Sequence, residues 1–459
     1  MHDQALRDRL VEHSLAGRYN AFVRAGLLAA IVGAVLFGVV LSGESAARGW
    51  QAFLVNWLFF TGLAGGSIAL TAVHKIANAK WSGLILRFGQ AAAAFLPVSL
   101  IGLVLIFTVG YQPIYGHMQE QLPLLQSGKA VWLSHGFMFG RLLVVLTLLF
   151  GLGWALIRAD LTHDLYLARG KVDERRRRLY QSWTAGFDGS PAARQRQHRK
   201  VNRLAAMFAP AYAFGFTLIA FDMIMALQPH WSSNLLGGFY FMGSFLGAHM
   251  LLALTMLYGE QQTGIHDLIS PKQRHDLGKL CFGFTVFWAY LMWSQFLVIW
   301  YGNLPEETGF VFSRLWGPWR PVGAAVFLGM FLVPFAGLLG VAPKKGRRTL
   351  ALFAGISLAA LWLERYLLVI PSVTSEHGPS FGLPELAATL TFIGLFLCCY
   401  GLFARTFPMV SPRLAEITLD REAHHAQVPN IGEHEEGPGD YVTEEIIEKD
   451  KHGNDKHGH

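Results

Sequence analysis

Ten apolar stretches, each long enough to cross a lipid bilayer, leave this chain few folds to adopt. A helix needs about 20 mostly apolar residues to span the hydrocarbon core, and in lipid its backbone polar groups must be hydrogen-bonded within the segment. The sequence therefore predicts an all-α membrane protein with ten transmembrane helices. Their expected ranges are 22–41, 52–73, 83–109, 131–157, 205–227, 236–257, 280–300, 321–341, 350–370 and 386–403.

The distribution of Lys and Arg predicts how these helices are oriented. Cytoplasmic loops of membrane proteins are enriched in both residues, and the connection 158–203 contains the strings ERRRR and RQRQHRK. If residues 1–21 are cytoplasmic, most basic residues fall on the cytoplasmic side, so we expect both termini there. Topology and contact with anionic headgroups explain these charges. We therefore expect lipid as a partner, and no nucleic acid, because no reader module is visible.

The cysteines, the N-terminus and residues 413–459 give no sign of a metal site or of a cleaved signal. Cys281, Cys398 and Cys399 lie in apolar runs without CxxC spacing, which gives no support to a zinc or iron–sulfur site. The N-terminus is too polar for a cleaved secretory signal. Residues 413–459 are rich in acids and His with few aromatic residues, which predicts a disordered cytoplasmic tail. No metal site is expected.

Ionisable side chains inside the apolar segments are the strongest functional signal. A charged group in lipid is costly, so it usually faces the protein interior and marks a pathway. We expect one polar row through the sixth, seventh and ninth helices, and a shorter one near the outer ends of the fourth and fifth. The proton-pathway candidates are Asp222, His249, Glu260, Asp276, Tyr290, Ser294 and Glu364.

Sequence spacing predicts how some of these side chains point. Tyr290 and Ser294 are one turn apart, so both are expected along the axis of a helix bundle. Glu364 and Arg365 are adjacent and are expected to point in different directions, each toward a partner on another helix. Arg141 is expected to pack against other helices or to serve as a counter-charge.

The histidines in or near the apolar segments bear on two hypotheses, a b-type haem and a quinone pocket. A b-type haem needs two His side chains at matching depth, and His135 lies near the outer surface whereas His249 lies near the middle, so no haem is expected. A quinone pocket needs apolar walls and one or two polar groups near the membrane surface. His135 and His230 are quinone candidates at the outer face, and His74 is one at the inner face.

Three stretches resemble the NrfD-like membrane subunits of alternative complex III, a bacterial quinol:electron-acceptor oxidoreductase. Residues 275–308, HDLGKLCFGFTVFWAYLMWSQFLVIWYGNLPEET, resemble the seventh-helix signature of that family. Residues 221–241, FDMIMALQPHWSSNLLGGFYF, resemble its turn between the fifth and sixth helices, and 56–82 resemble its second helix. Of the two paralogues in the family, ActC and ActF, the first two stretches look closer to ActF.

The resemblance implies a domain organisation and a location. It implies two four-helix bundles (NrfD-like) between two flanking helices, in the bacterial cytoplasmic (inner) membrane. The ranges are 22–41 for the first flanking helix, 52–227 and 236–370 for the bundles, and 386–403 for the final helix.

The resemblance also implies a function and partners. The chain would be a subunit without its own redox centre in a quinol-oxidising complex, contributing a proton pathway and a docking surface at Glu306 and Glu307. Expected partners are an ActC-like sister protein in the membrane, iron–sulfur and haem c subunits on the outer face, and a terminal oxidase. No cofactor is expected to be bound by this chain itself, with quinone or quinol left open, and the haem c and iron–sulfur clusters are expected in the partner subunits. Gln228 stands where the family usually has an acid and Met223 where Trp is common, which puts proton exit at this turn in doubt.

Three other functions stay open. One is the quinone-binding anchor of a polysulfide- or nitrite-reductase-type NrfD enzyme. Another is a stand-alone transporter, for which broken helices in matching halves are expected, and Pro97, Pro210 and Pro334 form no such pair. The last is a structural scaffold whose polar side chains only hold helices together.

Overall fold

The computed structural model describes residues 2–15, 17, 19–374 and 378–413, with side chains from residue 8 onward. Its described residues form helices and turns without a strand, which confirms the predicted all-α fold. Ten helical stretches among them are long and apolar enough to cross a membrane, in agreement with the sequence. The predicted tail beyond residue 413 lies outside the described residues.

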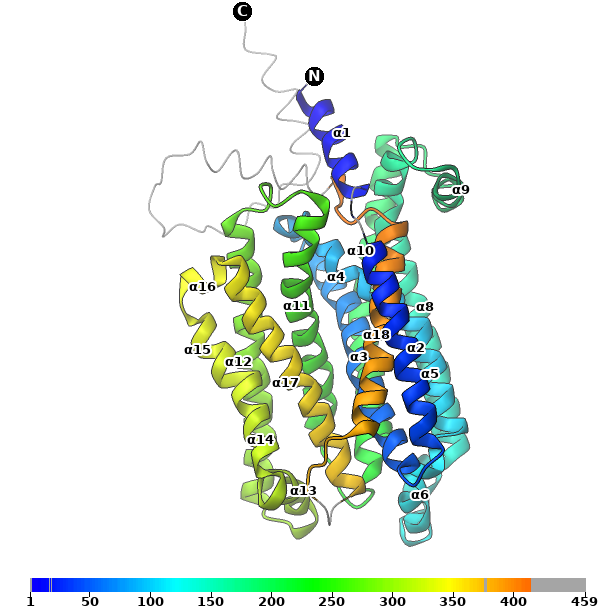
Figure 1. Cartoon of the computed structure of the whole chain (residues 1–459), viewed down its shortest axis with the longest axis vertical. Coiled ribbons are helices and arrows are strands. Elements are labelled where there is room, and N and C mark those ends of the chain that lie inside the picture. Colours follow the sequence, from blue (N-terminus) through cyan, green and yellow to red (C-terminus); the bar gives the residue numbers. More distant parts are fainter. Residues whose placement is uncertain (1, 16, 18, 375–377, 414–459) are drawn as a thin grey trace, which may run out of the picture. The chain divides into compact units, whose positions relative to one another are not determined.

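Most of the spanning stretches are single continuous helices, and three are interrupted (Figure 1). The continuous ones are α2 (Asn20–Leu41), α3 (Ala46–Ile76), α8 (His135–Ala168), α11 (Leu235–Thr263), α12 (Pro271–Gly302), α17 (Arg347–Val373) and α18 (Leu383–Thr406). The interrupted ones are α4 (Leu86–Gln90), η2 (Ala91–Phe95) and α5 (Leu96–Thr108); α10 (Pro191–Ile219), η4 (Ala220–Ile224) and η5 (Met225–Leu227); and α14 (Arg320–Phe327), η7 (Leu328–Leu332) and α15 (Val333–Leu339). The shorter elements are α1 (His2–Leu15), η1 (Lys80–Ser82), α6 (Tyr111–Gln121), η3 (Leu122–Leu124), α7 (Ser127–Trp132), α9 (Glu174–Trp183), α13 (Pro305–Leu315), η6 (Gly317–Trp319) and α16 (Val341–Lys345).

The connection expected over 158–203 is mostly helical, which corrects the prediction. The fourth span continues to Ala168, and α10 already begins at Pro191, where the Ser190 side chain accepts a hydrogen bond from the Ala193 backbone N–H. Apolar runs mark only the part of a helix that lies in lipid. Backbone hydrogen bonding continues past that boundary wherever the residues favour helix.

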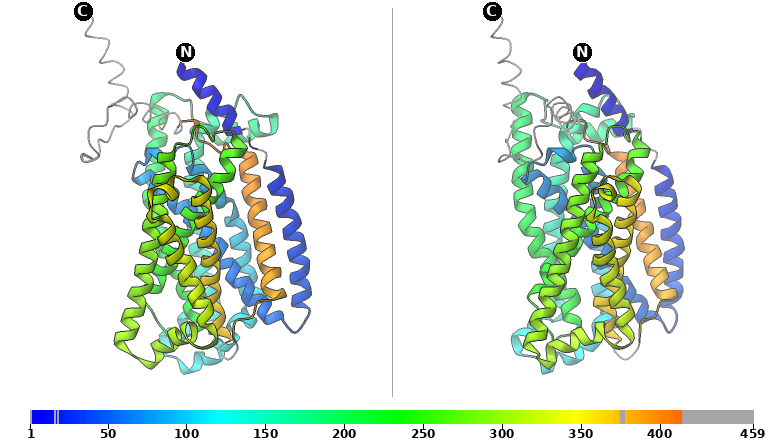
Figure 2. Two further views of the ribbon diagram at one scale, coloured as in Figure 1. Left: turned by 60° about the vertical axis from the view of Figure 1, so that its left-hand side comes forward. Right: turned by 90° about the vertical axis from the view of Figure 1, so that its left-hand side faces the viewer.

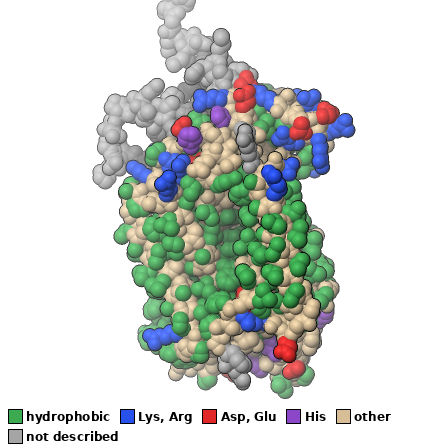
Figure 3. Space-filling model, viewed as in Figure 1, with side chains coloured by type: hydrophobic (Ala, Val, Ile, Leu, Met, Phe, Trp, Pro, Cys, Tyr) green, Lys and Arg blue, Asp and Glu red, His purple; other side chains and the backbone are tan. Residues whose placement is uncertain are grey.

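Charged side chains distinguish the two ends of the helices (Figures 1 and 3). Residues 169–190 and 264–270 connect helices at one end, and α6, α7 and α13 lie at the other. Lys and Arg gather at the first end in the view of Figure 3, whereas a broad apolar surface separates it from the second. We call these the basic end and the distal end.

The close approach of α3 and α11 joins the two halves of the chain. A Cβ at Gly62 would lie 2.7 Å from Ser244 Oγ, and one at Gly66 would meet the Ser244 carbonyl oxygen. Small residues four apart allow such contact between membrane helices. Because α3 packs against α11 and α17 as well as α5, α8 and α10, the division into two four-helix bundles stays a prediction.

The first and last spans, α2 and α18, pack against each other along one edge (Figure 2). A Cβ at Gly26 would lie 2.6 Å from the Cys398 backbone nitrogen, and one at Gly33 would meet the Thr391 backbone nitrogen. Gly394 approaches the Ala30 backbone in the same way. Glycines on both helices therefore let the two backbones touch.

Candidate functional site

Asp222 forms a buried ion pair with Arg141 near the distal end. Asp222 lies in the π turn η4 and is 0% exposed, and Arg141 lies near the start of α8. Arg141 Nε and Nη2 donate to Asp222 Oδ2 and Oδ1 over 3.0 and 2.8 Å, and Trp132 Nε1 donates to Oδ1 over 3.2 Å. This bidentate pair confirms the counter-charge expected of Arg141.

The histidines predicted at the outer face separate in the structure. His135 Nε2 donates to the Phe107 carbonyl oxygen over 2.8 Å, and its ring centre lies 4.0 Å from that of Tyr111. His230 is exposed, and no contact in the described part of the chain joins it to Asp222. The structure therefore groups His135 with aromatic side chains and leaves His230 on the surface.

Glu364 and Arg365 form an ion pair with each other, contrary to the prediction. Arg365 Nη1 lies 3.0 Å from Glu364 Oε1. Arg365 Nη2 also donates to the Tyr240 carbonyl oxygen and to Ser244 Oγ, at 3.3 and 3.4 Å, so the expected partner on another helix is present for Arg365. The Cβ atoms of adjacent helical residues point in different directions. The Arg365 side chain is nevertheless long enough to fold back and reach Glu364. We call Tyr240, Ser244, Glu364 and Arg365 the mid-membrane cluster.

Two buried polar atoms of this cluster and two on the buried face of α12 have no hydrogen-bond partner among the described residues. They are Glu364 Oε2, Arg365 Nε, Thr285 Oγ1 and Trp288 Nε1. A Cβ added at Gly243 would lie 3.1 Å from Arg365 Nη2 and 3.7 Å from Trp288 Cδ1, so the two side chains are neighbours. Buried polar atoms almost always have a partner, and water supplies it where protein does not. These four atoms are therefore the buried polar groups around the Glu364–Arg365 pair and on α12 that remain free to bind a further partner.

His74 and His249 lie side by side between the basic end and the mid-membrane cluster. Their ring centres are 6.4 Å apart and both are buried. His74 Nδ1 lies 2.8 Å from the Leu70 carbonyl oxygen and His249 Nδ1 lies 2.9 Å from that of Phe245, so each Nδ1–H donates within its own helix. Each Nε2 is then an acceptor. The sequence predicted that His74 lies just beyond the end of its span. In the structure α3 extends to Ile76, so His74 is a buried residue of this helix.

Glu260 and Asp276 occupy the basic end but do not share a contact. Glu260 is 0% exposed, with Arg347 Nε 3.2 Å from its Oε1 and Arg274 Nη1 3.9 Å from its Oε2. Asp276 is partly exposed and pairs with Lys279 at 2.8 Å. The first is a buried carboxylate with two counter-charges, whereas the second is a surface pair on the first turns of α12.

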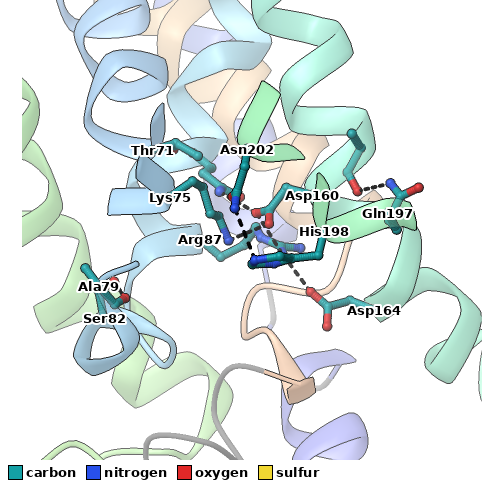
Figure 4. A network of polar contacts seen from close by, with 12 residues as sticks. Thr71, Lys75, Ala79, Ser82, Arg87, Asp160, Asp164, Gln197, His198 and Asn202 are labelled. Atoms are coloured by element: carbon teal, nitrogen blue, oxygen red, sulfur yellow. Dashed lines mark hydrogen bonds and ion pairs between the residues drawn. The ribbon is translucent and has the colours of Figure 1, made fainter. Parts of the chain in front are cut away.

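Four charged side chains that were not predicted as a site form a network at the basic end of α3, α4 and α8, with Arg87 and Asp164 buried and Lys75 and Asp160 partly buried (Figure 4). Asp160 pairs with Lys75, and Arg87 Nη2 lies 2.7 Å from Asp164 Oδ2 and 3.6 Å from Asp160 Oδ2. The predicted fourth span ended at residue 157, so both acids were assigned to a solvated loop. Their spacing of four residues after an apolar run was the available signal, because it places them on one helix face.

Neighbouring elements complete this basic-end network. Gln90 Nε2 donates to Asp160 Oδ2 over 2.8 Å, and Arg87 Nη1 donates to the Pro408 carbonyl oxygen over 3.3 Å. On α10, Gln197 Nε2 donates to the Ala159 carbonyl oxygen over 2.6 Å. The network therefore links the first spans to the segment that follows α18 (Figure 4).

The polar side chains predicted along α12 do not line an interior axis. Tyr290 is 60% exposed and Ser294 is half-buried, because α12 lies at the edge of the helices and turns this face outward. The buried face of α12 carries Thr285 and Trp288 instead. The expectation that Tyr290 faces inward is therefore wrong, and the interior polar groups of this helix are residues that the sequence analysis did not name.

The acidic turn after α12 is held at the distal end by an aromatic stack. Glu306 and Glu307 lie in the first turn of α13. The ring centres of Phe310 and Trp231 are 3.6 Å apart with their planes at 3°, and the Arg314 guanidinium lies 3.4 Å from the Phe310 ring centre. Burial lowers the pKa of Arg314. Packing thus fixes α13, and the two glutamates stand at its start.

No group of three or more His, Cys, Asp or Glu side chains that could hold a metal ion occurs among the described residues.

Comparison with known proteins finds a distant relative. No protein-family model matches this chain. The C component of the selenate reductase of Mesobacillus selenatarsenatis, named as a subunit of that enzyme, is 23% identical to it over 353 residues. These residues cover 74% of this chain and 78% of that protein. The similarity therefore extends over most of both chains at low identity.

Proposed function

We propose that this chain is an integral membrane subunit of a respiratory oxidoreductase whose catalytic and electron-transfer groups lie in other subunits. Ten helices suited to cross a membrane support the location. The distant similarity to a protein named as a subunit of selenate reductase supports the class of assembly.

Within this assembly the chain carries a proton pathway, and the mid-membrane cluster is the observation behind this proposal. Glu364 and Arg365 are buried among membrane-spanning helices, and Glu364 Oε2 lacks a protein partner among the described residues. Removing an ion pair from water costs several kcal/mol per ion before the pair recovers part of it. Apolar residues would hold the helices together without that cost. A carboxylate beside water can instead accept and release a proton.

The polar groups along α11 and α3 give the pathway its order. From the basic end, α11 carries Glu260, then His249, then Ser244 of the mid-membrane cluster. At 1.5 Å per residue, Glu260 and His249 are about 16 Å apart along the axis and His249 and Ser244 about 7.5 Å. These gaps exceed a hydrogen bond, so proton transfer along this route requires water or further polar side chains between these groups. His249 Nδ1 faces the Phe245 carbonyl oxygen, which leaves Nε2 for the pathway, with His74 beside it.

The finer proposal is a quinol-oxidising complex of the alternative-complex-III type, with this chain in the ActF-like position. Residues 275–308 and 221–241 carry the resemblance, with Asp222 in place and Gln228 departing from the pattern. An ActC-like protein would be the membrane partner. Iron–sulfur and haem c subunits would dock at the distal end, around Glu306 and Glu307.

A quinone-binding anchor is the second candidate. The buried Asp222–Arg141 pair and the His135 ring lie near the distal end, where a quinone headgroup would sit among aromatic walls. Asp222→Asn distinguishes the two candidates. They differ in quinone binding, because a proton pathway alone leaves the affinity for a quinol-site inhibitor unchanged in Asp222→Asn.

The test is to purify the native complex through a tag on this chain and to reconstitute it in proteoliposomes. Quinol oxidation and proton movement are then measured together. For Glu364→Gln we expect proton movement per electron to fall at least twofold, while haem and iron content stay those of the unaltered complex.

Glu174→Gln is the matched control, because it removes one carboxylate from the exposed helix α9. It is expected to retain both activities. Unchanged proton movement in Glu364→Gln would contradict the pathway. A chain that purifies without redox partners would contradict the oxidoreductase assignment itself.

A further inference from the structure

A surface cavity of about 320 Å³ lies between the basic ends of α2 and α18. Its lining residues are Asn20, Val23, Arg24 and Arg405. The two helices are held together immediately below it, because a Cβ at Gly401 would lie 2.8 Å from Val23 Cγ2. Arg405 follows Gly401 by one turn, so helix packing brings the two arginines from opposite ends of the chain to one cavity.

The two exposed guanidinium groups at this cavity have no carboxylate partner among the described residues, in contrast to three other cations at this end. Lys75, Arg87 and Arg347 all pair with a carboxylate. Among the described residues, neither Arg24 nor Arg405 has an ion pair, and no acid lines the cavity. Two arginines that line one cavity offer paired N–H donors, which is how guanidinium groups bind phosphate.

The helix surfaces next to the cavity are suited to acyl chains. Leu27 and Leu28 follow Arg24 by one turn toward the membrane and are 52% and 66% exposed. Leu402 precedes Arg405 by one turn, also toward the membrane. Leu402 lines a second cavity of about 210 Å³, whose walls include Trp154 and Phe403. From the basic end toward the membrane, the cavity with the two arginines is therefore followed by apolar surface. A phospholipid presents its headgroup and its acyl chains in the same order.

We propose that this cavity binds the phosphate of an anionic phospholipid, with Arg24 and Arg405 as the ligands. Basic pockets between membrane helices recognise anionic headgroups in this way. Asn20 supplies a further polar group at the same cavity. Such a lipid would bridge the first and last spans and stabilise their contact.

The experiment measures lipid retained by the full chain, or by its complex, in native mass spectrometry, with thermal unfolding as a second readout. The probes are phosphatidylglycerol, phosphatidylcholine and inorganic phosphate. We expect phosphatidylglycerol to be retained and to raise the unfolding temperature, and the other two to do neither. In Arg24→Gln/Arg405→Gln we expect about a 30-fold weaker affinity for phosphatidylglycerol.

The matched control is Arg175→Gln/Arg178→Gln, which removes two exposed arginines from α9 at the same end. It should retain phosphatidylglycerol. Equal loss in the control would show a general effect of surface charge and overturn the site. Equal retention of phosphatidylcholine, or an equal effect of inorganic phosphate, would overturn the assignment to an anionic lipid. If the double Gln variant does not fold, Arg24→Lys/Arg405→Lys keeps the charge, and phosphatidylglycerol retention no weaker than in the unaltered chain would argue against paired guanidinium contacts.

Discussion

The ion pair of Asp222 and Arg141 shows how the stability of this chain can depend on single residues. Each oxygen of the Asp222 carboxylate has a donor, and Asp222 itself is fully buried. A buried charge without its partner is far costlier than the pair, because nothing replaces the lost water. The two residues should therefore behave as one unit.

We predict that Asp222→Leu lowers the free energy of unfolding by about 3–5 kcal/mol, because it leaves Arg141 charged and unpaired. The double variant Asp222→Leu/Arg141→Met should be less destabilised than the single one. Denaturant titration of the purified chain in detergent measures both. Glu174→Ala, which breaks an exposed pair with Arg178, should change stability by less than about 1 kcal/mol. A double variant destabilised as much as Asp222→Leu, or more, would refute the coupling.

At the level of the element, the α2–α18 pair depends on glycine. We predict that Gly33→Leu lowers the free energy of unfolding by about 1–3 kcal/mol, because its side chain would collide with Thr391. Gly38→Leu is the control on the same helix, since a Cβ there meets nothing within 4 Å. Thermal unfolding compares them. Equal stability of the two variants would show that the helices are not in close contact.

The short helix α9 offers a prediction on pH. Asp173 caps it by accepting a hydrogen bond from the Arg176 backbone N–H, and this bond lowers the pKa of Asp173 below its ordinary 3.8. The charged cap therefore contributes fully above pH 3.8 and is lost as the pH falls through the lowered value. Asp173→Ala should show faster amide exchange over 174–177 at about pH 7. Exchange rates equal to those of the unaltered chain would contradict the cap.

At the level of the whole molecule, the orientation in the membrane is the central prediction. Ser182→Cys at the basic end and Gly309→Cys at the distal end are both exposed positions. In intact cells, a maleimide that cannot cross the membrane should label Gly309→Cys. It should label Ser182→Cys only after the membrane is opened. The opposite pattern would place both termini outside.

The all-α class, the ten spans and some of the buried charges, among them Asp222, Glu260 and Glu364, could be predicted from the sequence, because lipid demands long apolar helices and tolerates few ions. Tertiary structure alone decided which charges meet. Glu364 pairs with Arg365, His74 lies beside His249, and Tyr290 faces outward. Periodicity defines the faces of a helix but not which face another helix covers. That choice depends on packing between segments far apart in the chain, as in the joining of α2 and α18.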